Sequence, residues 1–173
     1  GLGYLVWREI LNGVRTKKKL KNFTLHAKVV LTISFVLLSL GTLLMLIFEW
    51  NNPATMEGMR FSDKLINSFF SATTPRTAGF NSISNSEMSP ASKLLTMAYM
   101  FIGGSPGSTA GGVKTTTLGI VIFTLISVLK GREDAEVYHR KLSQSTVYRA
   151  VAVFLLGITI VVLGVMILSI SEV

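Results

Sequence analysis

The chain has 173 residues, a formal net charge of +8 and no cysteine. Asp, Glu, Lys and Arg make up 15% of the residues, against about 25% in a typical soluble domain, and the mean hydropathy is +0.53. This composition excludes intrinsic disorder, a disulfide framework and any site built on a thiolate. The sequence starts without Met and stops directly after an apolar run, so we expect a segment of a longer protein.

Two uncharged stretches, residues 29–48 and 150–171, are long enough to cross a membrane. A hydrocarbon core of about 30 Å needs about 20 helical residues. The chain offers no amphipathic partners that would bury two such helices in a soluble core. We therefore predict an all-α integral membrane protein.

Lysine and arginine indicate the orientation of these spans. Residues 1–28 carry seven basic residues against one acid, and residues 130–149 are also basic, whereas residues 49–92 are balanced. The positive-inside rule places the two basic segments in the cytoplasm and residues 49–92 outside. The net charge thus follows from topology, and without an aromatic-interleaved basic face we predict no nucleic-acid partner.

The outer segment contains a helix of about half a membrane thickness. Residues 62–74 form an apolar helical pattern, with Ser62 as the expected N-cap. Pro75 cannot continue the helix, so we expect residues 76–82 to return in an extended conformation. Irregular backbone at membrane depth is tolerated only where it lines water or is buried in protein. The pattern predicts a re-entrant hairpin.

Such a hairpin suits a dehydrated cation. The carboxyl end of the half-helix carries partial negative charge, and an extended strand can direct its carbonyl oxygens at the ion. We expect Gly79 to supply the backbone freedom and Phe80 to pack behind the strand. Arg76, beside the strand, is expected to pair with an outer carboxylate.

These residues carry a resemblance to a known family. The stretch 77–81 is similar to the potassium-channel filter Thr-Val-Gly-Tyr-Gly, although Asn81 replaces the last glycine. The longer string 68–81 resembles the filter region of the Trk/Ktr/HKT potassium transporter superfamily, closest to the bacterial Ktr membrane subunits. The resemblance implies a filter of Thr77, Ala78, Gly79, Phe80 and Asn81, with K⁺ at the backbone carbonyls of Thr77, Ala78 and Gly79.

A second membrane helix is predicted over residues 91–129, beginning after the N-cap Ser89 and Pro90. As one helix it would reach about 58 Å, nearly twice the hydrocarbon core, so it must break. Five glycines and a proline place the break at residues 103–116. A nucleotide-binding P-loop is rejected because one extra residue precedes Lys114 and no strand precedes the motif.

A polar, glycine-rich interruption in a membrane usually lines a pathway, and the alternative is a packing break with no gating role. We expect Lys114 to face water or a carboxylate. In the resembled family the matching segment is a flexible intramembrane loop that gates conduction. The resemblance thus assigns a gating loop to Gly103, Gly104, Ser105, Gly107, Ser108, Thr109, Gly111, Gly112 and Lys114.

The resemblance also implies the organisation of the whole protein. Residues 1–28 would be the basic cytoplasmic end of a preceding unit, and 29–130 a complete membrane-pore-membrane repeat, the third of four in a pseudo-tetrameric pore. Residues 131–146 would be a cytoplasmic connector, and 147–173 the first membrane helix of the next repeat. The expected partners are a second copy of the subunit and a cytoplasmic nucleotide-binding regulatory ring, in the plasma membrane of a bacterium.

The predicted function is potassium uptake. No bound cofactor is expected, a dependence on Na⁺ stays open, and the absence of paired carboxylates or a nucleophile with a base argues against an enzyme. The alternatives are a secondary transporter with discontinuous helices that binds its substrate at residues 103–116, and an adaptor that conducts nothing.

Overall fold

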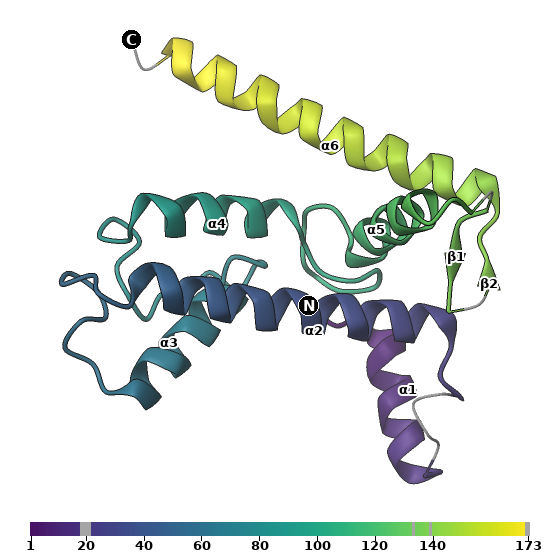
Figure 1. Cartoon of the computed structure of the whole chain (residues 1–173), viewed down its shortest axis with the longest axis horizontal. Helices are drawn as coiled ribbons and strands as arrows, with labels where there is room; N and C mark the ends of the chain where they lie inside the picture. Colours follow the sequence, from purple (N-terminus) through teal and green to yellow (C-terminus); the bar gives the residue numbers. More distant parts are fainter. Residues whose placement is uncertain (18–21, 133, 139, 172–173) are drawn as a thin grey trace.

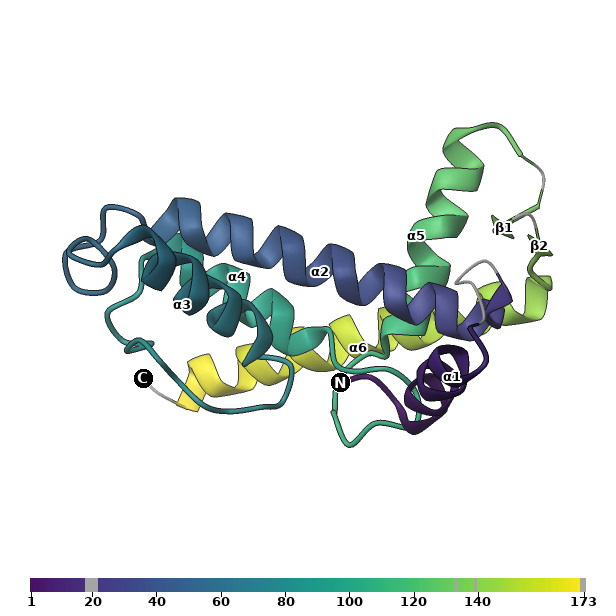
Figure 2. The same ribbon diagram turned by 90° about the horizontal axis from the view of Figure 1, so that it is seen from below.

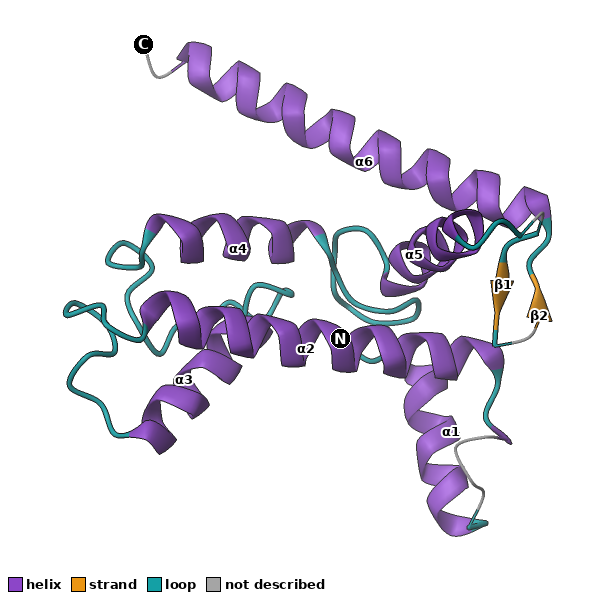
Figure 3. Cartoon of the chain, viewed as in Figure 1, coloured by secondary structure: helices purple, strands orange, loops and turns teal. Residues whose placement is uncertain are grey.

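The computed structural model describes residues 1–17, 22–132, 134–138 and 140–171. The elements, shown in Figures 1 and 3, are in chain order α1 Tyr4–Arg15, α2 Leu25–Glu49, α3 Phe61–Thr73, α4 Pro90–Phe101, α5 Thr115–Leu129, β1 Glu136–Val137, β2 Arg140–Lys141 and α6 Gln144–Ser171.

Helix α2 is the central element, and α1, α3, α4 and α5 all contact it. Its N-cap Thr24 accepts a hydrogen bond from the Ala27 amide at 3.2 Å. The buried side of α2 supplies Val29, Ile33 and Leu37 to the main hydrophobic core. Helix α6 diverges from this group along its length (Figure 1), with most of its apolar side chains exposed. Within the described residues, α2 and α6 are the two helices long and apolar enough to cross a membrane.

Two glycines, one on α2 and one on α5, allow α2 to pack closely against its neighbouring helices. At Gly41 an added Cβ would lie 2.8 Å from the ring of Tyr99, which is buried on α4 and donates its hydroxyl to the Leu37 carbonyl at 2.7 Å. At Gly119 on α5, an added Cβ would lie 2.7 Å from Val29. Because packed interiors tolerate little extra volume, these glycines fix how near α4 and α5 can approach.

The structure changes several expected boundaries. The outer helix begins at Phe61 with Arg60 at the N-cap position, so the prediction of Ser62 as N-cap is wrong. Ser89 does cap α4, accepting the Ser92 amide at 3.3 Å with Pro90 in the first turn. The chain leaves helical geometry after α4 and resumes it at α5, whose axis turns steeply away from α4 (Figure 2).

The fold is not purely helical. Between α5 and α6 the strands β1 and β2 pair antiparallel, with Glu136 opposite Lys141 and Val137 opposite Arg140. Val137 is 1% exposed and belongs to the main core, which ties the hairpin to the helices. A two-residue strand has too little periodicity to be detected in sequence.

Candidate functional site

A tight turn follows α3 where the sequence suggested an extended strand. The Thr74 carbonyl accepts two amides, from Ala78 at 3.0 Å and Gly79 at 3.3 Å. Thr77 and Gly79 have positive φ values of 66° and 80°. The prediction of extended backbone is therefore wrong here, and Phe80 is 72% exposed rather than packed behind the turn.

The carbonyls of this turn fall into two groups. The Arg76 carbonyl accepts the Thr77 hydroxyl at 2.7 Å, and the Phe80 carbonyl accepts the Thr74 hydroxyl. Between them, the carbonyls of Thr77, Ala78 and Gly79 accept no hydrogen bond from the described part of the chain. These three residues and Asn81 are exposed. The turn thus presents three successive carbonyls without donors.

Residues 102–114, which join α4 to α5, form a loop closed at its base. Ile102 and Val113 form a parallel bridge, in which the Gly103 amide donates to the Val113 carbonyl at 3.0 Å. The Thr115 amide donates to Gly104 at 3.1 Å. An added Cβ at Gly103 would lie 1.5 Å from the Gly111 carbonyl oxygen. Two glycine segments therefore cross in direct backbone contact.

The predicted loop residues divide into a buried and an exposed group. Gly103, Gly104 and Ser105 are buried, Ser108 and Lys114 are half-buried, and Gly107, Thr109, Gly111 and Gly112 are exposed. Gly107 and Gly112 have positive φ values of 75° and 72°, which glycine adopts without strain.

The start of the chain binds the buried part of this loop. The Gly3 amide donates to the Ser105 hydroxyl at 2.5 Å, the Ser105 amide donates to the Gly1 carbonyl at 2.8 Å, and Tyr4 donates to Gly107 at 3.2 Å. Sequence reasoning missed this contact because residues 1–3 lie about a hundred positions away and carry no polar side chain. The glycine spacing around Gly3 was the one available signal.

Two basic side chains bind backbone carbonyls of this loop. Lys114 donates to the Ala110 carbonyl at 2.6 Å, a partner that the sequence did not predict. Arg76 donates to the Gly103 carbonyl at 3.2 Å, so the prediction of an outer carboxylate partner is wrong. Both contacts are intramolecular links of the loop.

The turn and the loop face a common hollow of about 520 Å³. Thr77 and Ala78 line it from the turn, and Thr109 and Ala110 line it from the loop. Arg76, Thr73, residues of α2 and the first two residues of the chain form the rest of the wall. The two segments singled out from the sequence therefore lie next to each other in space.

A buried carboxylate joins the outer ends of α2 and α4. Glu49, the last residue of α2, is fully buried and accepts from Asn52 Nδ2 and the Thr55 hydroxyl, each at 2.6 Å. Its other oxygen accepts the Ser89 amide at 2.8 Å. Because Ser89 is the N-cap of α4, the carboxylate lies at the positive end of that helix dipole.

A buried lysine joins α3 to the same end of α2. Lys64 is 6% exposed, donates to the Trp50 carbonyl at 2.6 Å and lies 4.5 Å from the centre of the Trp50 ring. Trp50 is the C-cap of α2, where a cation is favourable. Sequence reasoning missed this contact between Lys64 and Trp50.

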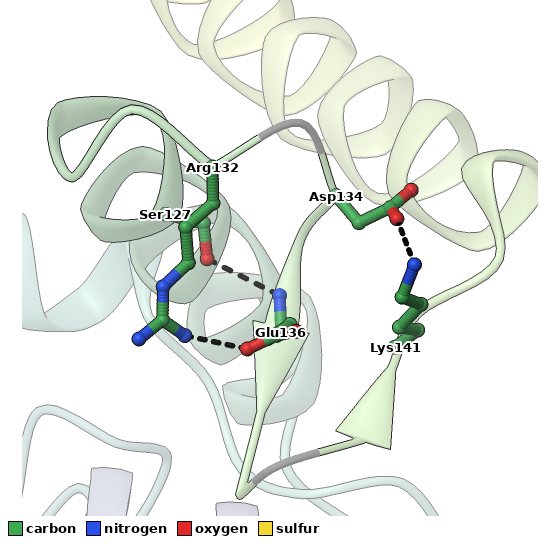
Figure 4. Close-up of polar contacts among 5 residues, drawn as sticks. All are labelled: Ser127, Arg132, Asp134, Glu136 and Lys141. Atoms are coloured by element: carbon green, nitrogen blue, oxygen red, sulfur yellow. Dashed lines mark hydrogen bonds and ion pairs between the residues drawn. The ribbon is translucent and has the colours of Figure 1, made fainter.

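Two ion pairs and one hydrogen bond from a backbone amide link residues around the hairpin between α5 and α6 (Figure 4). Arg132 pairs with Glu136, and Lys141 pairs with Asp134, each at 2.5 Å, while the Glu136 amide donates to the Ser127 hydroxyl at 3.2 Å. The hydrogen bond to Asp134 raises the pKa of Lys141 above its ordinary value. Both pairs are largely solvent-exposed and contribute little to stability.

Known proteins resemble the chain over nearly its whole length. It is 45% identical over 172 residues to the potassium/sodium uptake protein NtpJ of Enterococcus hirae. It is 34% and 30% identical to the Ktr system potassium uptake proteins B and D of Bacillus subtilis. Each alignment covers 99% of this chain but only 37–38% of the relative, so the chain spans just over a third of those proteins.

The apolar helices α2 and α6, together with these transporter relatives, identify a membrane protein. Residues 7–173 match the family of TrkH cation transport proteins. The chain therefore belongs to the TrkH family, within the Trk/Ktr potassium transporter superfamily.

Proposed function

We propose that this chain forms part of the membrane subunit of a potassium uptake system, with residues 76–82 as its selectivity filter. K⁺ binds the backbone carbonyls of Thr77, Ala78 and Gly79, at the carboxyl end of α3. The observation that carries the proposal is that these three exposed carbonyls lack hydrogen-bond donors among the described residues, whereas the carbonyls on either side have them.

The backbone of the turn supports this assignment. In a uniformly extended strand successive carbonyls point to opposite sides. Alternation of left-handed with ordinary dihedrals turns them toward one side. Thr77 and Gly79 have positive φ and Ala78 does not. Helix α3 has 13 residues, about 20 Å, so it can enter a bilayer but not cross it, and its carboxyl end favours a cation.

We further propose that residues 103–116 gate the pathway. The loop is closed at its base, and its residues Thr109 and Ala110 line the hollow shared with the turn. The hydrogen bond between Lys114 and Ala110 keeps the tip of the loop in this position. Displacing the tip would open the hollow on the side that the loop lines, away from the filter turn.

The remaining organisation is proposed from the family and the charge pattern. Residues 29–130 form the third membrane-pore-membrane repeat, and α6 begins the next one. The complete subunit forms a homodimer in a bacterial plasma membrane, on a cytoplasmic nucleotide-binding ring docked against residues 130–141. Ktr system relatives, named as parts of a system, support a partner subunit.

The filter is tested by Gly79→Ser in the complete protein. Gly79 has φ of 80° with no atom within 4 Å of an added Cβ, so the substitution acts through the backbone rather than by a clash. A side chain in the left-handed region costs about 1–2 kcal/mol. We expect the K⁺ concentration for half-maximal uptake to rise about tenfold, since about 1.4 kcal/mol is a factor of ten, with weaker preference over Na⁺.

The matched control is Gly58→Ser, in the outer loop. An added Cβ at Gly58 also has no atom within 4 Å, and Gly58 has no positive φ. Uptake by this variant should equal that of the unmodified protein. If Gly79→Ser behaves like Gly58→Ser, the filter assignment is wrong.

A further inference from the structure

Arg76 lies in the proposed filter turn but directs its guanidinium to the loop. It immediately precedes the three donor-free carbonyls, and its Nη2 donates to the Gly103 carbonyl at 3.2 Å. The side chain is half-buried, and its Nε is buried without a hydrogen-bond partner among the described residues. The Gly103 carbonyl is therefore the acceptor that fixes the guanidinium.

Gly103 is a firmly held residue of the loop. Its amide donates to Val113, and the place of its missing side chain is taken by the Gly111 carbonyl. With Arg76 bound, both backbone polar groups of Gly103 are used. Arg76 thus attaches the filter turn to the crossing from which the loop extends.

The same arginine lines the hollow between turn and loop, together with Ala78 on one side and Thr109 on the other. A rearrangement of the crossing would move the Gly103 carbonyl away from the guanidinium. The cation would then lose its acceptor beside the hollow, which is costly for a partly buried charge. The contact therefore favours the arrangement in which loop and turn are adjacent.

We propose that Arg76 is a positioning residue that couples the filter turn to the intramembrane loop and holds the loop in its closed arrangement. This inference rests on the proposed function. It assigns to a residue next to the filter an effect on gating, exerted through the hydrogen bond to Gly103, in place of a direct effect on ion binding.

The test is a double-mutant cycle in the complete protein. The variants are Arg76→Met, a deletion of residues 108–110 at the tip of the loop, and both together, with K⁺ uptake measured against K⁺ concentration. Coupling between sites is commonly 5–150-fold. We expect Arg76→Met to raise the maximal rate about fivefold, with the half-saturating concentration changed less than about twofold. In the deletion background it should have no further effect.

Two controls and one substitute variant make the outcome decisive. Arg60→Met removes an exposed arginine at the other end of α3 and should change nothing. Arg76→Lys keeps a cationic donor within reach of Gly103, so its maximal rate of K⁺ uptake should stay close to that of the unmodified protein. If Arg76→Met does not accumulate in the membrane, Arg76→Gln, which removes the charge and shortens the side chain, replaces it in the cycle.

The proposal is overturned if the effect of Arg76→Met is equal in both backgrounds, if it shifts half-saturation instead of the maximal rate, or if Arg76→Lys behaves like Arg76→Met. Those results leave the filter assignment intact, because that assignment depends on Gly79→Ser alone. If Gly79→Ser has no effect while the cycle shows coupling, the filter assignment fails and the link between turn and loop stands.

Discussion

Gly103→Ala is expected to abolish the closed base of the loop between α4 and α5. The added Cβ would lie 1.5 Å from the Gly111 carbonyl oxygen and 2.6 Å from its carbon, and these are backbone atoms that cannot rotate away. Overpacking costs about 1–3 kcal/mol, and we expect a loss at or above about 3 kcal/mol in the free energy of unfolding. Thermal unfolding of the purified complete protein in detergent measures it.

Gly111→Ala is the matched control on the other side of the same crossing. An added Cβ at Gly111 has no atom within 4 Å, and Gly111 does not have positive φ. Its unfolding free energy should change by no more than about 0.5 kcal/mol, as for an exposed substitution. Equal losses from the two variants would contradict the backbone crossing described here.

Glu49→Gln is expected to loosen the outer ends of α2 and α4. The carboxylate accepts three hydrogen bonds, from Asn52, Thr55 and the Ser89 amide. In glutamine an NH2 group replaces one of the two oxygens, so a donor would lie opposite one or more of these donors. Hydrogen bonds to charged groups are worth about 1.5–3 kcal/mol each, so we expect a loss of about 2–3 kcal/mol. Hydrogen exchange should rise at the amide of Ser89, whose acceptor is weakened.

Glu57→Gln provides the comparison, since Glu57 is exposed in the same outer loop. Its amide exchange and unfolding free energy should match those of the unmodified protein. A similar loss in both variants would mean that net charge outside the membrane, rather than the buried carboxylate, determines stability.

Long helices and their interruption followed from local pattern. The uncharged run at 29–48 lies inside α2, and the run at 150–171 lies inside α6, because membrane length and hydropathy constrain such helices strongly. The glycines at 103–104 and 111–112 likewise marked the break between α4 and α5. A 39-residue apolar stretch cannot remain one helix across a bilayer.

Contacts of charged side chains did not follow from pattern. An outer carboxylate was expected for Arg76, and water or a carboxylate for Lys114, because buried charges are usually paired. Each instead donates to a backbone carbonyl of the loop, made available where the glycine-rich segment leaves helical geometry. Because every residue has a backbone carbonyl, the residue types in the sequence do not indicate which carbonyl will accept such a hydrogen bond.

The sequence by itself determined that the chain is a largely helical membrane protein with a short helix at 61–73 and a break between α4 and α5, since these depend on composition and chain length. Only the tertiary structure decided that the turn after α3 and the loop before α5 share one hollow, and that residues 1–4, Arg76 and Lys114 hold this loop. The reason is physical. These contacts depend on backbone dihedrals and on the approach of segments distant in sequence, neither of which is encoded in hydropathy or spacing.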